Sequence, residues 1–410
     1  MLYFNENSVN HTERIQAAKP IFHFIANGMF GGIGGGDIHF LEMAKSAIAA
    51  GYRVHFFGGY VLRQAASERL PEFDLTLTEK DPSLRMSDVT LGGQIRLFHL
   101  FFRRCMATRR LVDAIPENEP TYAVTDYWFD CLPLLRCRAR RKFMILGMDS
   151  PAAREIIFRG RPDVTALRLN SIYYWLSQSL SLRLFRRCPS KRLFYVHPAM
   201  KPRLLALGYR EEELVYVSNG CNVEVADRVR AQEKKFDVIW LGRVHKQKGI
   251  DDLLTTLRFL RDQIPDFRAV IVGNVETALK PLLTEKGIQG CVQFTGMVSE
   301  EEKFRLFKAS RMFLMPSRQE SWGIVIAESL ACGTPVVAYD LPAYRPVFGS
   351  LVRYVPNFDI ATFQKEAAAL VNETRKNPNV FSADAIAKFK RENSWTAAGK
   401  RFLAGVQSLA

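Results

Sequence analysis

Short apolar runs alternate with helix-length segments along most of the chain. Continuous apolar strands separated by helices are typical of parallel sheets that are covered on both faces. Residues 58–94 show no clear pattern. The strands predicted by the remaining pattern are Ile21–Ala26, Arg53–Phe57, Tyr122–Asp126, Phe143–Leu146, Leu193–His197, Leu214–Ser218, Asp237–Leu241, Ala269–Val272, Val292–Thr295, Met312–Met315 and Pro335–Tyr339. The expected fold class is therefore α/β, with parallel sheets.

Two polar features divide the predicted strands into two sets. A Ser-Asn-Gly turn at residues 218–220 ends the first set, and the charged connector Asn222–Lys235 precedes the second. Turn residues followed by a polar segment are typical of a domain boundary. We therefore expect one α/β domain in residues 1–221 and another in residues 222–383. Residues 384–410 read as one or two helices that could pack back onto the first domain.

The composition is that of an ordinary globular protein. The chain has 410 residues, of which 48% are apolar and 24% are charged. No uncharged stretch approaches the roughly 18 consecutive apolar residues of a membrane-spanning helix, and the first residues lack the features of a signal peptide. Seven cysteines without a Cys-X-X-Cys pair fit a reducing compartment. We expect a soluble, cytoplasmic protein.

Positive charge is concentrated in one part of the first domain. The net charge is +15, and residues 91–210 contain 22 Lys and Arg against 8 Asp and Glu. A solvated basic face, an anionic membrane surface and a polyanionic substrate all fit such a surplus. Nucleic acid is not expected as a partner, because no zinc-finger, RNP or helix-turn-helix signature accompanies the charge.

Aromatic residues lie beside two arginine pairs in this basic region. The residues concerned are Phe98, Phe101, Phe102, Arg103-Arg104 and Arg109-Arg110. Their pattern predicts a helix against anionic lipid, with basic side chains at the headgroups and rings in the interface. This would place the protein peripherally on the inner face of the membrane. The alternative is that the rings belong to the core and the arginines only keep the surface soluble.

A glycine-rich loop follows the first predicted strand. Residues 28–36 contain six glycines and lead into a helix. Glycine lets a ligand approach the backbone, and the N–H groups at a helix N-terminus attract an anion. Asp37 stands where a dinucleotide motif needs glycine and where a P-loop needs lysine, so neither motif is present. We expect this loop to bind an anion or a substrate, with a flexible turn as the alternative.

Two cations follow the first strand of the second domain. Arg243 comes just after the strand, and Lys248 precedes the next helix. Open α/β sheets bind ligands at the carboxyl ends of their strands. Arg243 is suited to forked contact with phosphate oxygens, and Lys248 adds a point charge. The acidic residues Asp251 and Asp252 are interpreted as the helix start, and no metal site is predicted.

Two glutamates lie at the junction of a later strand and helix. Glu320 falls in the loop, and Glu328 lies in the helix that we expect to begin near Gly323. Carboxylates accept hydrogen bonds from sugar hydroxyls, and N–H groups at a helix start bind phosphate. The flanking sequences Glu-Ser-Trp-Gly and Gly-Thr-Pro-Val-Val-Ala make this pair distinctive.

In this order, the motifs resemble those of family 4 of the retaining glycosyltransferases, of the group 1 type. The resemblance is carried by Gly242-Arg243, Lys248-Gly249, Val272-Gly273, Phe294-Thr295-Gly296, Glu320, Glu328 and Gly333-Thr334-Pro335-Val336-Val337. It covers most of the chain and is strongest from residue 236 to residue 345. It implies the GT-B fold, in which two Rossmann-like domains face a cleft. It also implies metal-independent sugar transfer from a UDP- or GDP-sugar with retention at the anomeric carbon.

The resemblance implies roles for individual residues. Arg243 and Lys248 would hold the donor diphosphate, Glu320 would lie near the donor sugar, and Glu328 would hold the ribose. Backbone groups of Ser321, Trp322, Gly323, Ile324 and Val325 would meet sugar and phosphate. The remaining donor-binding residues would be Gly242, Gly273 and Val298 from the second domain and Gly34 and Gly35 from the first. No cofactor is implied besides the nucleotide sugar, which is a substrate.

One departure from the family follows the strand Phe143–Leu146. Many relatives carry one or two histidines there, whereas this chain has Gly147-Met148-Asp149-Ser150-Pro151. Asp149 is a candidate for the sugar or acceptor side, and a helix N-cap is the alternative. His197, after a later strand, is given no role.

The reaction implied is a front-face transfer to a hydroxyl of a lipid-linked or growing-glycan acceptor, in polysaccharide or glycolipid assembly. The leaving diphosphate helps to deprotonate that hydroxyl while Arg243 and Lys248 stabilise the growing charge. A double displacement would need a carboxylate nucleophile, and Glu320 is disfavoured for that role. The alternatives are a sugar-nucleotide epimerase on a similar scaffold and a non-catalytic nucleotide-sugar or lipid-binding module.

Overall fold

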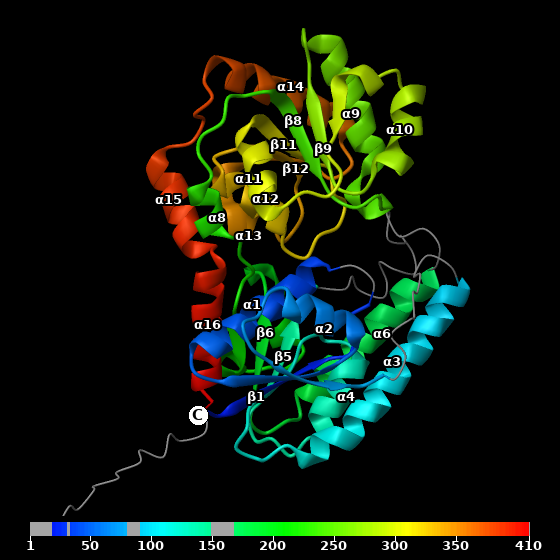
Figure 1. The fold of residues 1–410 in the computed structure, drawn as a ribbon, viewed down its shortest axis with the longest axis vertical. Coiled ribbons are helices and arrows are strands. Elements are labelled where there is room, and N and C mark those ends of the chain that lie inside the picture. Colours follow the sequence, from blue (N-terminus) through cyan, green and yellow to red (C-terminus); the bar gives the residue numbers. More distant parts are fainter. Residues whose placement is uncertain (1–18, 31–32, 80–90, 149–167, 410) are drawn as a thin grey trace, which may run out of the picture.

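The computed structural model describes residues 19–30, 33–79, 91–148 and 168–409. Two β-sheets, one above the other in Figure 1, form the centres of two layered α/β domains. The first sheet has the strand order β3-β2-β1-β4-β5-β6-β7, and the second has the order β10-β9-β8-β11-β12-β13. The strand pairs of both sheets are parallel, as the apolar pattern predicts.

The elements have the following bounds. The strands are β1 (Ile21–Ala26), β2 (Arg53–Gly58), β3 (Asp74–Leu77), β4 (Thr121–Ala123), β5 (Lys142–Leu146), β6 (Lys191–Tyr195), β7 (Leu214–Tyr216), β8 (Phe236–Leu241), β9 (Ala269–Val272), β10 (Val292–Phe294), β11 (Ser310–Met315), β12 (Val336–Tyr339) and β13 (Val352–Val355). The helices are α1 (Gly35–Ala49), α2 (Tyr60–Ser67), α3 (Leu91–Leu111), α4 (Trp128–Arg136), α6 (Arg168–Phe185), α7 (Lys201–Ala206), α8 (Val223–Arg228), α9 (Ile250–Gln263), α10 (Glu276–Glu285), α11 (Glu300–Lys308), α12 (Ile324–Ala331), α13 (Arg345–Phe348), α14 (Ile360–Lys376), α15 (Ala383–Glu392) and α16 (Trp395–Gln407).

Each predicted strand is present, with ends that shift by up to three residues. The structure adds the edge strands β3 and β13, which the pattern did not predict. β3 is half-buried at most, so it lacks the continuous apolar run of the central strands. β4 ends at Ala123, and Asp126 therefore lies beyond the strand rather than at its end.

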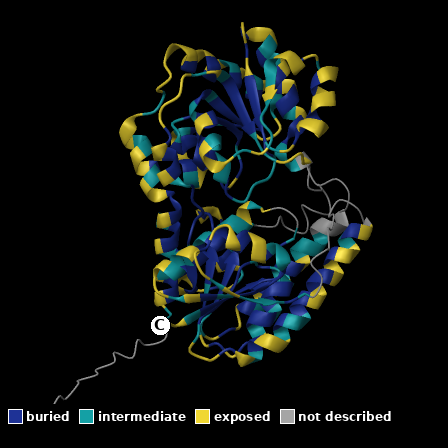
Figure 2. Ribbon diagram, in the orientation of Figure 1, coloured by how far each residue is buried: buried dark blue, intermediate teal, exposed yellow. Residues whose placement is uncertain are grey.

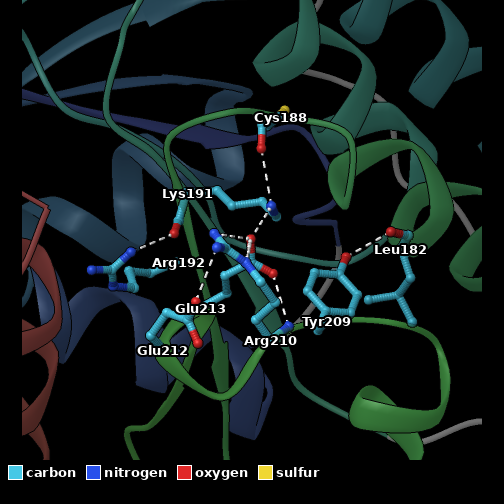
Figure 3. A network of polar contacts seen from close by, with 8 residues as sticks. All are labelled: Leu182, Cys188, Lys191, Arg192, Tyr209, Arg210, Glu212 and Glu213. Atoms are coloured by element: carbon cyan, nitrogen blue, oxygen red, sulfur yellow. Dashed lines mark hydrogen bonds and ion pairs between the residues drawn. The ribbon is translucent and has the colours of Figure 1, made fainter.

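A buried ion pair explains why β6 begins earlier than the apolar pattern predicts. Lys191 Nζ lies 2.7 Å from Glu213 Oε1 and donates to the Cys188 carbonyl at 2.9 Å. The backbone N–H and the guanidinium of Arg210 donate to the same carboxylate (Figure 3). Buried charges are tolerated when they are paired and hydrogen-bonded. This network fixes the start of β6 against the turn that precedes β7.

The last helix returns to the first domain. α15 contacts α12 of the second domain, whereas α16 lies along α1 of the first (Figure 1). The ring of Phe402 in α16 packs 5.8 Å from that of Phe22 and 5.1 Å from that of Phe194. Where the chain crosses back, Cys221 and Ser394 form a parallel bridge. The two chain crossings between the domains therefore lie side by side.

Burial follows the layered architecture. In Figure 2 the sheets of both domains are buried and the outer sides of the helices are exposed. Central strands such as β1 and β8 are almost completely buried, which accounts for their predominantly apolar sequences. Within the described ranges, no helix is sufficiently long and apolar to cross a membrane.

Candidate active site

The starts of two helices, one from each domain, are in contact. Gly35 is the first residue of α1, and Ile324 is the first residue of α12. A Cβ atom added at Gly35 would lie 3.2 Å from Ile324 Cδ1, so glycine permits this approach. The N–H groups and dipoles of helix N-termini attract anions. Their meeting point is therefore suited to a phosphate group.

Arg243 places an exposed positive charge near this meeting point. It follows β8, and within the described residues it has neither a hydrogen bond nor an ion pair. Asp37, in the first turn of α1, accepts a hydrogen bond from the Gly34 N–H at 2.7 Å. Burial raises the pKa of Asp37, and the nearby charge of Arg243 opposes that rise. The guanidinium therefore lies within electrostatic reach of the other domain and remains open to an anionic ligand.

Lys248 and Glu320 form an ion pair at the same edge of the second sheet. Their Nζ and Oε1 atoms are 2.5 Å apart, and both side chains are largely buried. Gln247 Nε2 donates to the Gln319 carbonyl at 2.7 Å, which joins the two loops that carry the pair. The structure thus brings together a lysine and a glutamate that are 72 residues apart in the sequence.

Glycine is required where these two loops touch. Gly249 has a φ of +63°, and a Cβ atom there would lie only 2.0 Å from the Pro316 carbonyl oxygen. Beside this contact, the Arg318 N–H donates to the Gln247 carbonyl at 2.8 Å. The Arg318 guanidinium also pairs with Asp252 at 3.0 Å. Asp252 therefore has a structural partner, in keeping with its interpretation as part of the helix start.

Glu328 lies in the second turn of α12 and is 6% exposed. Its Oε1 lies 2.5 Å from Nζ of Lys303 on α11. Burial raises the pKa of Glu328, and the charge and hydrogen bond of Lys303 oppose that rise. Lys303 was not predicted from the sequence, because it lies on a separate helix at no recognisable spacing. It supplies the positive charge that a buried carboxylate needs.

The start of α12 presents backbone rather than side chains. Gly323 has a φ of +94°, and an added Cβ atom would lie 3.0 Å from Tyr344 Cε1. The Trp322 side chain is fully buried, with its ring 5.3 Å from that of Phe348. Any contact of Trp322 with a ligand would therefore use the main chain. The predicted residues at this helix start are Ser321, Trp322, Gly323, Ile324 and Val325.

Glycines also shape the edge formed by β8, β9 and β10. Gly273 has a φ of +124°, and a Cβ atom there would lie 3.1 Å from the Gly242 carbonyl oxygen. Its N–H donates to the Gly296 carbonyl at 2.9 Å. Val298 follows and is half-buried. The predicted nucleotide-side residues Gly242, Gly273 and Val298 thus share one edge, where a flat ligand could lie against backbone.

A cavity of about 240 Å³ opens in the first domain. Its walls are mainly apolar, and Ser321 of the second domain contributes to the rim. The aromatic residues that line it are Phe30, Phe40, Phe101, Tyr127, Phe129 and Tyr174. Gly147 and Met148, which stand where the resembled family often has histidine, line it as well. Asp149, the predicted sugar-side candidate, lies outside the described residues.

Asp126 is the buried acid of this cavity. Its Oδ2 accepts a hydrogen bond from Gln178 Nε2 at 2.5 Å, and Gln178 also donates to the Met148 carbonyl at 2.7 Å. Arg203 in turn donates to Gln178 Oε1 at 3.1 Å. Burial raises the pKa of Asp126 to about 6, although the hydrogen bond from Gln178 opposes the rise. The sequence pattern does not single out Asp126, because it places this residue at the end of the predicted strand Tyr122–Asp126.

His39 adds a neutral hydrogen-bonding group to the cavity wall. Its Nδ1 lies 2.6 Å from Asn219 Oδ1, an arrangement that requires the proton on Nδ1. Burial lowers the pKa of His39 to about 4, so the ring is uncharged near neutral pH. Its Nε2 is buried and has no hydrogen-bond partner within the described residues. That nitrogen is therefore an available acceptor.

Arg104 anchors the base of the glycine-rich loop. It is 2% exposed, pairs with Glu79 at 2.7 Å, and donates to the carbonyls of Asn27 and Met29. The sequence pattern placed Arg104 and Phe101 at a lipid surface, and for these two residues it was wrong. Phe101 is buried against Phe129, with ring centroids 4.5 Å apart. Phe101 instead lines the cavity, and Arg104 holds the backbone at the start of the loop.

Comparisons with known proteins bear on the fold and on the second domain. Residues 224–387 match the family model of the glycosyl transferases group 1. The structure is similar to that of Anabaena HepE in complex with UDP and glucose, with a TM-score of 0.66, 16% identity, and coverage of 95% of this chain and 100% of that chain. The fold is GT-B. The GT-B fold predicted from the sequence is thereby confirmed, and the group 1 match falls on the second domain of this GT-B chain.

Relatives in sequence are also glycosyltransferases. The D-inositol 3-phosphate glycosyltransferase of Arthrobacter sp. (strain FB24) is 34% identical over 110 residues, which are 25% of this chain and 26% of the relative. The chain thus spans about a quarter of the length of the first curated relatives that it matches. The enzyme of the same name from Thermobifida fusca (strain YX) is 25% identical over 339 residues, or 75% of this GT-B chain and 73% of the relative.

Proposed function

We propose that this GT-B protein is a retaining, metal-independent glycosyltransferase of family 4. It moves a sugar from a UDP- or GDP-sugar to a hydroxyl of an acceptor. One observation carries the proposal: Arg243, the Lys248–Glu320 pair and the start of α12 lie at one edge, opposite a cavity in the other domain. The group 1 match, the glycosyltransferase relatives and the UDP and glucose in the HepE structure support it.

The donor diphosphate binds between Arg243 and the N–H groups that begin α12. Lys248 is held by Glu320 before the donor arrives. A diphosphate that approaches Lys248 draws the ammonium toward itself and leaves Glu320 to accept hydrogen bonds from the donor sugar. As the sugar–phosphate bond breaks, Arg243 and Lys248 stabilise the charge that grows on the diphosphate.

The ribose of the donor is held by Glu328. Lys303 keeps this buried carboxylate charged, so that it accepts hydrogen bonds from the two ribose hydroxyls. The base lies along the edge that contains Gly242, Gly273 and Val298, where the backbone is open to close approach.

The acceptor hydroxyl enters from the cavity of the first domain. Asp126 and His39 provide hydrogen-bond acceptors there, and the aromatic walls suit the apolar face of a sugar ring. The hydroxyl loses its proton to the departing diphosphate on the same face of the sugar, which yields retention. A cavity for an acceptor, apart from the donor residues, is what distinguishes this proposal from an epimerase, which needs only the nucleotide sugar.

A thermal-shift panel of UDP-, GDP- and ADP-sugars tests the proposal first. The preferred donor is then incubated with candidate glycan and lipid-linked acceptors, and the product's anomeric configuration is determined by NMR. We expect stabilisation by one donor, an α-linked product from an α-donor, and activity that persists in EDTA. A new sugar nucleotide formed without acceptor would instead establish an epimerase. Binding without transfer or hydrolysis would establish a non-catalytic module.

A further inference from the structure

Half of the large hydrophobic side chains that are exposed in the described residues lie on two helices of the first domain. Twelve such side chains are exposed in all. Six of them belong to α3 and α6, namely Ile95, Phe98, Phe102, Leu111, Leu176 and Leu180. Ile95 is 63% exposed and Leu176 is 53% exposed. Isolated exposed apolar residues are common, but such a concentration marks an interaction surface.

The two helices form one continuous face. Figure 1 shows α3 and α6 along the same flank of the first domain. The ring of Phe98 on α3 lies 6.1 Å from that of Tyr173 on α6, and 5.6 Å from that of Trp128. Trp128 Nε1 donates to the Tyr173 hydroxyl at 2.6 Å. An aromatic bridge therefore joins the two helices, and we call their exposed side the α3–α6 face.

The α3–α6 face is basic and contains no acidic residue on either helix. Neither 91–111 nor 168–185 includes Asp or Glu. Exposed arginines accompany the apolar side chains, and these are Arg96, Arg103, Arg110 and Arg183, followed by Arg186 and Arg187 just beyond α6. Apolar residues flanked by arginines match the boundary between acyl chains and anionic headgroups. A protein partner would have to offer an equally acidic and apolar groove, and nothing on this face selects for one.

The same helices also build the proposed acceptor cavity. On α3, Phe101 lines the cavity while its neighbour Phe102 is 48% exposed on the outer side. On α6, Tyr174 lines the cavity while Leu176 is exposed. The α3–α6 face is therefore one helix thickness away from the cavity. A hydroxyl carried on a lipid could reach the cavity from a surface bound to this face.

We propose that the α3–α6 face docks onto a bilayer that contains anionic lipid, and that the acceptor is presented from this bilayer. The presentation of the acceptor from the bilayer rests on the proposed function, whereas the docking does not. Arginines contact the headgroups, and Ile95, Phe98, Phe102, Leu176 and Leu180 enter the interface. Arg104 and Phe101 have no part in the docking, since both are buried.

Cosedimentation with vesicles of phosphatidylcholine and graded phosphatidylglycerol tests the docking. We compare the wild type with Arg103→Gln/Arg110→Gln and with Ile95→Gln/Phe102→Gln. The matched control is Arg258→Gln/Leu282→Gln, which removes an exposed charge and an exposed apolar side chain from the second domain. Removing two arginines should weaken binding about 10- to 30-fold at low salt. The apolar variant should weaken binding at low and high salt alike, and the control should bind as the wild type does.

Two results of the vesicle experiment would overturn the docking. One is wild-type protein that stays in the supernatant with strongly anionic vesicles at low salt. The other is equal loss of binding by the control, which would show a non-specific charge effect. Sedimentation velocity without lipid tests the rival occupant, because a concentration-dependent dimer abolished by Ile95→Gln/Phe102→Gln would assign the face to a second copy. Nucleotide thermal shifts on the same variants report separately on the proposed function, and we expect them to be unchanged.

Discussion

Arg243 and Lys248 are two cations with the same predicted partner but different surroundings. Arg243 is exposed and, among the described residues, has no ion pair, whereas Lys248 already pairs with Glu320. Arg243→Ala should therefore lower turnover by about two to three orders of magnitude without affecting the melting temperature. Arg258→Ala, an exposed arginine remote from this edge, is the control. Turnover close to that of the wild type, with an intact circular dichroism spectrum, would refute the diphosphate assignment.

The two glutamates should differ in what they limit. Glu328→Gln removes the charge that Lys303 pairs with, and a ribose contact exists in both ground and transition states, so nucleotide affinity should fall more than turnover. Glu320→Gln should lower turnover more than affinity, because the contacts of Glu320 with the donor sugar develop as the sugar is transferred. Isothermal titration with UDP and GDP, alongside steady-state kinetics, separates the two effects. Unchanged nucleotide affinity in Glu328→Gln would exclude the ribose role.

Asp126 makes the pH dependence testable. Its pKa of about 6 lies above the ordinary value of 3.8, so the group is ionised above pH 6 and gains a proton below it. Since the carboxylate is the form that accepts a hydrogen bond from the acceptor, activity should fall as pH drops through 6. Asp126→Asn should lower turnover about 10- to 100-fold and flatten this limb of the profile. If activity of the variant still falls below pH 6 as in the wild type, a group other than Asp126 is responsible for the fall.

The same carboxyl has the opposite effect on stability. A raised folded-state pKa means that the folded protein binds the proton more tightly than the unfolded chain does, so this contribution to stability is present below pH 3.8 and is lost as pH rises to about 6. Asp126→Asn removes the cost of burying the charge. We therefore expect an unchanged or higher melting temperature for the variant at pH 7.5. A large loss of stability there would show that the carboxylate is needed for packing.

The sequence pattern singled out those candidate site residues that lie inside a motif. Arg243, Lys248, Glu320 and Glu328 stand at spacings that a single loop or helix imposes. Asp126 and Lys303 were missed because their roles depend on burial between separate elements, which local spacing does not encode. A polar Thr-Asp pair, one residue beyond the end of the buried strand β4, was the available signal for the former. No comparable signal exists for Lys303 on α11.

At the scale of elements, the contact between two loops decides the position of the Lys248–Glu320 pair. Gly249→Ala would force a side chain to within 2.0 Å of the Pro316 carbonyl at a φ of +63°. We expect a loss of at least about 2 kcal/mol in the free energy of unfolding, together with weaker nucleotide binding as the loops separate. Gly290→Ala is the control, since a Cβ atom there meets nothing within 4 Å. Denaturant titration of both variants checks this, and equal stability would contradict it.

Elements in the sheet centres were predicted well because they are buried on both faces. β1 and β8 are mostly apolar, with His23 and Asp237 as their polar residues, so the sequence reflects their buried environment directly. β3 and β13 are short edge strands with half-buried residues, and their sequences resemble loops. β6 starts at Lys191. A charged residue gives no sign in the sequence that its position is buried, and here the ion pair with Glu213 explains the burial.

At the scale of the whole molecule, α16 is part of the core of the first domain. Phe402→Ala would remove a fully buried ring that packs on Phe22, Tyr122 and Phe194. The free energy of unfolding of the first domain should fall by about 3–5 kcal/mol. Calorimetry checks this, with the half-buried Leu409→Ala as control. A melting profile equal to that of the wild type would show that α16 is only an accessory to this domain.

The position of α16 also bears on how the protein is made. Residues 395–407 leave the ribosome only after the whole second domain has been synthesised, yet they complete the aromatic cluster around Phe22 of β1. While residues 222–394 are being synthesised, the cluster in the nascent first domain therefore stays uncovered. Such exposed apolar surface recruits chaperones and favours aggregation. Arrest-peptide force profiling should accordingly record the second domain folding before the first is complete.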